Sequence, residues 1–212
     1  MPTTARPGLP EFWVTGLARV LMGDQPCRLE AWAKAHFKLP KKVESPAMAN
    51  WKATHTELLR DEIARLKAEG WKVRVEQFFR LQGQTAILSG KPDVIAQQDG
   101  KRPKIVDTKG GDPRESDICQ VMIYCIVIPL VWDAPGMTFE GEVVYRTHRV
   151  PITAQEIAPM RPKVFALLRD LAATKPEPNP SEGACRFCDV PEDICSSRYT
   201  GTSQVDVSTS EF

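Results

Sequence analysis

The stretch "KIVDTKGG", residues 104–111, places an aspartate and a lysine two positions apart at the end of an apolar strand. Its first three residues form an extended run, and the two glycines end it. Because side chains alternate between the two faces of a strand, Asp107 and Lys109 are expected on the same face. A surface ion pair on an exposed edge strand is one explanation, and it would contribute little free energy. The second explanation is that the two charged residues take part in a reaction. The rest of the sequence is needed to choose between the two explanations.

The overall composition is that of a globular protein with no strong charge bias. The chain has 212 residues, of which 42% are hydrophobic, enough for one sizeable core. The net charge of +1 gives no general attraction to nucleic acid, so any basic surface must be local. Basic clusters occur at 38–42, 100–104 and 145–149, and clusters of this size are usually solvated surface.

No segment of the sequence is predicted to associate with a membrane. The longest apolar run, residues 121–132, is too short to span a bilayer and contains a proline. Residues 1–12 lack the charged-then-apolar order of a signal peptide. We therefore expect a soluble cytoplasmic protein, in which cysteines are reduced or bound to metal.

Hydrophobic periodicity predicts a mixed α/β fold. Helical spacing and breaker residues predict two short helices, a long helix, a buried helix ended by Pro129, and a final helix with an internal proline. Alternating apolar residues predict strands before and after the buried helix. The expected helices span 12–37 (the two short ones), 45–70, 115–128 and 153–174, and the expected strands lie in 72–83, 86–97, 103–110 and 141–152.

Composition divides the chain into four parts. Residues 1–12 are Pro-rich and predicted to be flexible, and residues 13–175 form the α/β domain. Residues 176–198 are rich in proline and cysteine without periodicity, and residues 199–212 are predicted to be a disordered tail.

A hairpin signal brings two carboxylates together. The Asp-Gly pair at 99–100 predicts a turn between the second and third strands. If the turn centres there, Asp93 lies opposite Asp107, and Lys91 opposite Lys109. Two carboxylates at cross-strand distance disfavour mutual ionisation unless a cation lies between them. The alternatives are a charged solvent face or a one-residue slip in register.

Three polar side chains on helices are candidates for the same site. His55 shares a stripe with the apolar residues of the long helix and would add a nitrogen ligand, which favours manganese over magnesium. A histidine in such a stripe is otherwise an ordinary core residue. Gln120 and Tyr124, four positions apart, share a face of the buried helix, where core hydrogen bonding is the alternative.

These motifs in this order resemble the PD-(D/E)XK nuclease superfamily, in its RecB-like branch. The resemblance rests on His55, "GKPD" ending at Asp93, "DTK" at 107–109 and "QVMIY" at 120–124. It implies a restriction-endonuclease-like core, a mixed central sheet flanked by helices, that hydrolyses phosphodiesters. In that case the Mn²⁺ or Mg²⁺ ligands are His55, Asp93, Asp107 and the Thr108 carbonyl, Lys109 assists the attacking water, and Gln120 and Tyr124 line the site.

The six cysteines are of two kinds. Two lie in the apolar helix and are predicted to be inert core residues, namely Cys119 and Cys125. Three others form C-x2-C-x6-C, a metal-clamp spacing, and one remote cysteine is available as a fourth ligand. Zinc and an iron–sulfur cluster both fit this spacing, and unpaired surface thiols are the third possibility. The four candidate ligands are Cys27, Cys185, Cys188 and Cys195.

With the nuclease motifs, this cysteine pattern resembles the iron–sulfur RecB-like nucleases of the type of the fourth CRISPR-associated protein. The resemblance covers roughly residues 13–195. It implies a [4Fe–4S] cluster held by one cysteine before and three after the catalytic domain. It also implies trimming of single-stranded DNA ends, as spacer precursors for the CRISPR integrase complex. Thr108 and the spacing of the last two cysteines depart from the family pattern, and neither is expected to affect a side-chain ligand.

Two other functions compete with this one. A solo nuclease of phage, plasmid or repair origin would use the same chemistry without CRISPR partners. A catalytically silent DNA-binding scaffold subunit would keep the fold alone, and the intact set of Asp93, Asp107 and Lys109 argues against it.

Overall fold

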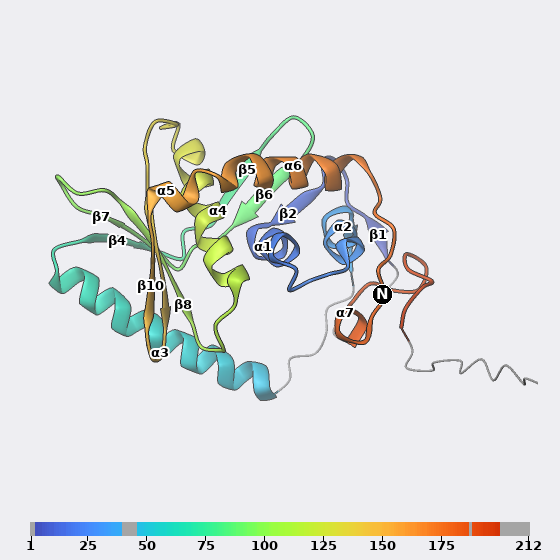
Figure 1. Ribbon diagram of the computed structural model, residues 1–212, viewed down its shortest axis with the longest axis horizontal. Coiled ribbons are helices and arrows are strands. Elements are labelled where there is room, and N and C mark those ends of the chain that lie inside the picture. Colours follow the sequence, from blue (N-terminus) through green and yellow to red (C-terminus); the bar gives the residue numbers. More distant parts are fainter. Residues whose placement is uncertain (1–2, 40–45, 187, 200–212) are drawn as a thin grey trace, which may run out of the picture.

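The computed structural model describes residues 3–39, 46–186 and 188–199. In these ranges the chain forms mixed sheets flanked by helices (Figure 1). The strands are β1 Thr4–Ala5, β2 Glu11–Trp13, β3 Phe37–Lys38, β4 Lys72–Val75, β5 Phe79–Gln82, β6 Ile87–Gly90, β7 Val94–Gln97, β8 Lys104–Lys109, β9 Glu140–Tyr145 and β10 Arg149–Ile152. The helices are α1 Val14–Met22, α2 Arg28–His36, α3 Pro46–Ala68, α4 Glu115–Val131, α5 Ala154–Ile157, α6 Met160–Ala173 and α7 Glu182–Arg186. No helix among these is long and apolar enough to cross a membrane.

The largest sheet has the strand order β10-β9-β8-β7-β4. β8 and β9 are parallel, whereas the other neighbours are antiparallel, so this sheet is mixed. In the β7–β8 ladder Val94 lies opposite Val106 and Ile95 opposite Ile105. Each pair of numbers sums to 200, so the register predicted from the Asp-Gly turn is confirmed over residues 94–96 and 104–106, and Asp93 and Asp107 lie just beyond its last pair.

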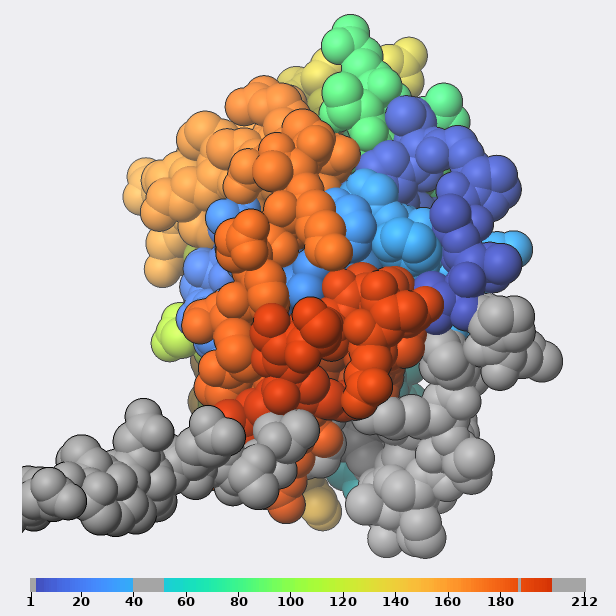
Figure 2. Space-filling model, turned by 90° about the vertical axis from the view of Figure 1, so that its right-hand side faces the viewer, coloured from blue at the N-terminus to red at the C-terminus, as the bar shows by residue number. Residues whose placement is uncertain are grey.

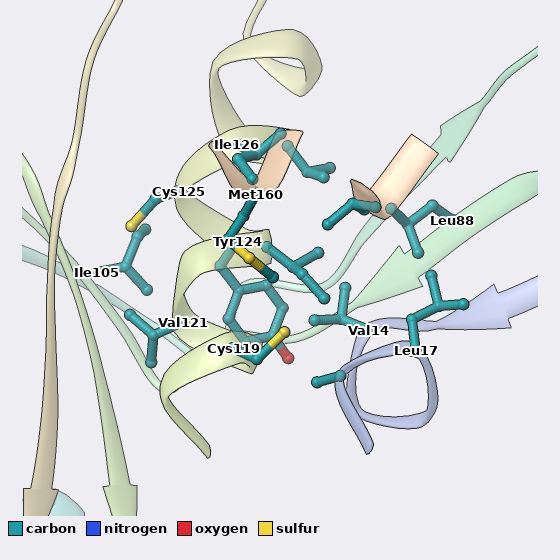
Figure 3. Close-up of a cluster of buried hydrophobic side chains, with 14 of the residues drawn as sticks. Val14, Leu17, Leu88, Ile105, Cys119, Val121, Tyr124, Cys125, Ile126 and Met160 are labelled. Atoms are coloured by element: carbon teal, nitrogen blue, oxygen red, sulfur yellow. The ribbon is translucent and has the colours of Figure 1, made fainter. Parts of the chain in front are cut away.

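Helices cover the two faces of this sheet, and the alternation along β8 shows how. Ile105 belongs to the large core that includes α1, α4 and α6. Val106 belongs to a second cluster with Leu59 and Leu66 of α3. Figure 3 shows Ile105 beside residues of α4, including Val121. The predicted fold class, a mixed central sheet flanked by helices, is confirmed.

A buried ion network fixes α3 to the sheet. Glu62 is only 1% exposed, and its carboxylate lies 2.5 Å from a guanidinium nitrogen of Arg65 and 2.5 Å from one of Arg149 in β10. Burial raises the pKa of Glu62, but the hydrogen bonds from the two arginines outweigh it and hold the pKa below its usual value. Because a buried carboxylate without partners is strongly destabilising, this network determines where α3 lies and therefore where His55 points.

Two predicted strands are each divided in two. The run 72–83 breaks at Glu76, whose φ of 47° bends the chain. The run 86–97 breaks before Pro92, which lacks the N–H that a continuing strand would need. The predicted pairing of Lys91 with Lys109 is therefore wrong, because Lys91 lies in the break. Its ammonium group lies 2.5 Å from the Glu76 carboxylate instead.

The two predictions that involve prolines in helices need correction. α4 continues past Pro129 to Val131, since a proline in the last turn removes only one helical hydrogen bond, and the chain turns at Asp133 with φ 51°. The expected helix over 153–174 is two helices, α5 and α6, and Pro159 caps the start of the second.

The chain before residue 13 is more ordered than expected. β2 pairs in parallel with β6, and Phe12 is 2% exposed, so Glu11 and Phe12 belong to the folded core and not to the flexible segment predicted over residues 1–12. The predicted disordered tail lies outside the described residues, except for Tyr199.

Candidate active site

The predicted site residues gather where β8 ends and α3 crosses it. His55 on α3 has its Nε2 atom 3.0 Å from Oδ2 of Asp93, which lies just before β7. The backbone of Gly110, directly after β8, is so close to α3 that a Cβ atom there would lie 3.2 Å from the Thr54 side chain. This close approach accompanies the contact between the helix histidine and the Asp93 carboxylate.

Asp93 is held by three hydrogen-bond partners on one oxygen. Its Oδ2 atom accepts from the Thr108 backbone N–H at 2.8 Å and from the Thr108 hydroxyl at 2.7 Å, in addition to the contact with His55. Burial raises the pKa of Asp93, but these contacts lower it below its ordinary value. The hydrogen bond with Asp93 in turn raises the pKa of His55, against the effect of burial. Thr108, which was expected to leave the side-chain ligands unaffected, therefore helps to position the Asp93 carboxylate.

Asp107 is buried and paired with a charge. It is 1% exposed, and its Oδ1 atom accepts a hydrogen bond from Gln120 Nε2 at 3.1 Å. Its Oδ2 atom forms an ion pair with Lys109 Nζ at 2.6 Å. Burial raises the pKa of Asp107 to about 6, although Lys109 opposes the shift.

Lys109 stays an ammonium group in this setting. Burial lowers its pKa, but the Asp107 carboxylate more than compensates, and the pKa is raised overall. Nζ also lies 3.3 Å from Gln120 Oε1 and 3.9 Å from Asp117. Lys109 can therefore donate hydrogen bonds or supply a positive charge, but it is not a base.

Asp117 was not predicted as part of this group. It faces Lys109, and its Oδ2 atom accepts a hydrogen bond from the Tyr145 hydroxyl at 3.2 Å. The available signal was its position on α4, three residues before Gln120 and therefore on the same helical face.

Tyr124 supports the site from inside the core. It is 2% exposed, its ring meets the Phe79 ring edge-on at 6.0 Å, and burial raises the pKa of its hydroxyl. A Cβ atom at Gly90 would lie 2.7 Å from this ring, so only glycine fits there. Figure 3 shows Tyr124 among apolar side chains. Contact between Tyr124 and a substrate strand stays a prediction.

The residues present fit a divalent ion, although they do not yet surround one. Within residues 3–39, 46–186 and 188–199, no group of three or more His, Cys, Asp or Glu side chains is arranged to hold a metal ion. The chemistry of the donor set favours a fit. A histidine and two buried carboxylates are ligand types that divalent ions such as Mn²⁺ accept.

The Thr108 hydroxyl offers a direct test of how Asp93 is positioned. Thr108→Val keeps the shape but removes one donor to a buried carboxylate, so we expect a loss of about 1–3 kcal/mol in the free energy of unfolding. Thr108→Ser keeps the donor and should lose much less. Urea unfolding of both variants measures the difference, and equal stability of Thr108→Val and wild type would contradict this role.

The four candidate cysteine ligands help to line one cavity, although among the described residues they are not arranged to hold a metal ion. The cavity has a volume of about 20 Å³, enough for about one water molecule. Figure 2 shows the C-terminal segment lying against the N-terminal helices, which brings the remote cysteine to the other three. The Tyr199 backbone N–H lies 3.4 Å from Sγ of Cys185, a contact that suits a thiolate. The cysteines at this cavity are Cys27, Cys185, Cys188 and Cys195, beside apolar residues such as Leu29 and Val190.

The other two cysteines are core residues. Cys119 and Cys125 are 1% and 4% exposed, and Figure 3 shows both on α4 among apolar side chains. Burial raises the pKa of Cys119 to about 12 and also raises that of Cys125. Both therefore stay protonated and inert, as predicted.

The basic cluster at 145–149 lies next to the carboxylates. Tyr145, the last residue of β9, is the register partner of Lys109. The following turn exposes Arg146, Thr147 and His148, and the His148 ring stacks on Tyr145 at 4.8 Å. The sequence suggested ordinary solvated surface, and only the parallel β8–β9 pairing places this turn beside the site.

No protein-family model matches the chain, and no curated protein is significantly similar to it. Solved structures with similar folds include SSO0001, at 13% identity and a TM-score of 0.43, with 93% of this chain and 91% of that chain covered. LHK-Exo in complex with dAMP has 16% identity and a TM-score of 0.43, with 76% and 88% covered. The alkaline exonuclease LHK-Exo from Laribacter hongkongensis has 13% identity and a TM-score of 0.43, with 77% and 88% covered. The function proposed below therefore rests on the site geometry.

Proposed function

We propose that this protein is a metal-dependent deoxyribonuclease. One observation carries the proposal: the helix histidine, the buried carboxylates of Asp93 and Asp107 and a charged lysine converge at the end of β8. A surface ion pair does not account for a carboxylate that is 1% exposed. Perturbed titrating groups that face one another are typical of catalytic sites.

The residues of the site have separate roles in the proposed hydrolysis. Asp93, Asp107, His55 and the Thr108 carbonyl would hold Mn²⁺ or Mg²⁺. Such an ion, when bound, lowers the pKa of a coordinated water and offsets negative charge on the phosphate. Lys109 orients the attacking water and stabilises the charge that develops on the phosphate, because it remains protonated. The amide of Gln120 touches both Asp107 and Lys109 and keeps them aligned.

Local positive charge supports DNA as the substrate. The net charge of +1 does not attract nucleic acid, but the exposed turn with Arg146 and His148 adjoins Tyr145 and Lys109. A cationic turn beside a phosphodiester site suits contact with the neighbouring phosphates of a strand.

The cysteine cavity supports a structural metal centre. Four thiols from both ends of the domain line it, so a bound [4Fe–4S] cluster would join the termini across the catalytic core. Zinc would use the same four ligands. The cavity's small volume requires the side chains to move apart for a cluster.

In its finer form, the proposal is trimming of single-stranded spacer precursors in CRISPR adaptation, in the cytoplasm, with the spacer-integrase complex as partner. The cysteine ligands together with the nuclease residues support it through the family resemblance. The second candidate is a solo nuclease of phage, plasmid or repair origin.

The test is cleavage of an end-labelled single strand by purified protein with Mn²⁺, Mg²⁺ or a chelator. We expect cleavage with the metal ions and none with the chelator. Asp107→Asn, purified in the same way, excludes a contaminating nuclease. A folded wild-type protein that binds DNA but cleaves nothing with either ion would instead be a scaffold subunit.

Metal affinity should depend on pH in a defined direction. Below its pKa of about 6, Asp107 is protonated and cannot bind a cation, so this group alone should lower the Mn²⁺ affinity by up to about tenfold per pH unit there. His55, whose pKa is raised, must also lose a proton, which steepens the dependence. Above both pKa values the affinity should level off. Calorimetric titration from about pH 5 to about pH 8 measures this.

His55→Asn is the matched control for the pH experiment, since it removes one of the two titrating ligands. Its affinity should show the shallower dependence that belongs to Asp107 alone. An affinity for Mn²⁺ that does not change with pH would exclude both residues as ligands.

A further inference from the structure

Two exposed aromatic side chains, one at the end of β2 and one directly before β5, lie against each other. Trp13 is 51% exposed and Phe78 is 53% exposed. Their ring centroids are 5.9 Å apart, and the planes are inclined at 46°. Isolated exposed apolar residues are normal, but two large rings in contact form an apolar patch that invites a partner.

The backbone connects both rings to the catalytic carboxylates. Trp13 is the register partner of Ser89 in the β2–β6 pair, and β6 ends at the next residue before the chain reaches Asp93. Phe78 follows Glu76 by two residues, and the Glu76 N–H donates to the Asp93 carbonyl oxygen at 2.9 Å. The two rings are therefore tied to the segment that carries the first carboxylate.

A strained bend turns Phe78 outward. Glu76 has a φ of 47°, a conformation that non-glycine residues seldom adopt. Its carboxylate is held by Lys91 at 2.5 Å. The next ring, Phe79, is 4% exposed and begins β5, so the two neighbouring phenylalanines point in opposite directions. Backbone strain that exposes a ring beside a reactive site is typical of a binding function.

We propose that Trp13 and Phe78 form a platform on which unpaired bases of single-stranded DNA stack next to the cleaved phosphate. This rests on the proposed nuclease function. Aromatic rings stack on every base, so such a platform binds a strand without reading its sequence. Bases inside a duplex are already stacked on one another, so only a single strand offers free faces to the two rings. The platform therefore selects single strands over duplexes.

The test measures the affinity for a fluorescent oligothymidine by anisotropy, in buffer without divalent ions. Trp13→Ala and Phe78→Ala should each weaken single-strand binding about 5- to 100-fold. Trp13→Phe and Phe78→Tyr keep a ring and should bind nearly as wild type. Val75→Ala is the matched control, because Val75 is 41% exposed on the neighbouring strand β4 but has no ring. A duplex of the same length should show little change in any variant.

A strand built from abasic units separates stacking from damage to the loop. It offers phosphates but no bases, so wild type and Phe78→Ala should bind it equally. Three results would each overturn the platform. They are an equal loss of affinity for abasic and normal strands, wild-type affinity in both alanine variants, and no single-strand binding by the wild-type protein. Because no divalent ion is present, the measured binding affinity does not depend on cleavage. Failure of the nuclease assay alone would therefore refute only the enzymatic function.

Discussion

Asp107→Ala is expected to lower Mn²⁺-dependent cleavage of a single strand by at least about a thousandfold. The substitution removes a buried carboxylate that would contact both the ion and its water, and such stabilisation is worth several kcal/mol. Raising the Mn²⁺ concentration should not restore activity. Turnover of an end-labelled strand, measured over a range of Mn²⁺ concentrations, gives the result.

Two further variants make this prediction specific. Asp107→Asn keeps an oxygen that can accept from Gln120 Nε2, so it should fold normally and still be inactive. Lys109→Ala should also be severely impaired but should retain Mn²⁺ binding, because an ammonium group 2.6 Å from Asp107 competes with the cation for that carboxylate. All three variants should bind DNA, since phosphate contacts elsewhere supply most of the affinity. Wild-type turnover in Asp107→Ala would mean that Asp107 and Lys109 of "KIVDTKGG" form an ordinary ion pair without a catalytic role.

Cys188→Ala is expected to remove the metal centre and to lower the melting temperature by about 10 °C or more. A bound metal contributes its binding free energy to folding, and this centre would join segments far apart in the chain. Wild-type protein purified without oxygen should be brown with a broad violet-blue absorbance shoulder, and the variant should be colourless. Absorbance and metal analysis of both proteins measure this.

Cys119→Ala is the matched control for the metal centre, since Cys119 lies in the core away from the cavity. It should keep the colour and the metal. Loss of the metal in Cys119→Ala, or its retention in Cys188→Ala, would contradict the sorting of the cysteines. If the wild-type protein is colourless and contains stoichiometric zinc, the metal centre is a zinc site with the same four ligands and not an iron–sulfur cluster.

Sequence patterns predicted the structure correctly where a single segment determines its own geometry. The Asp-Gly turn and the alternation of apolar residues gave the β7–β8 register correctly, because a slip by one residue would turn every side chain to the other face. The long helix α3 followed from its periodicity, and Gly70 with φ 85° lies just after it. The convergence of His55 with Asp93 then followed from the family pattern.

The missed features depend on long-range or backbone detail. The pairing of Glu62 with Arg149 joins residues 87 positions apart, and periodicity carries no signal for it. The strand break at Glu76 depends on a positive φ that nothing in its residue type demands. Only the carbonyl of Thr108 was given a role, because the contact of its hydroxyl with Asp93 lies beyond the last pair of the β7–β8 ladder.

The most direct test of the central claim follows Mn²⁺ binding and single-strand cleavage in one titration of wild-type protein. The account predicts that the cleavage rate rises in parallel with occupancy of a site that Asp107→Ala abolishes, and that a chelator stops cleavage. Cleavage that persists in the chelator, or a bound ion that leaves Asp107→Ala fully active, would contradict it.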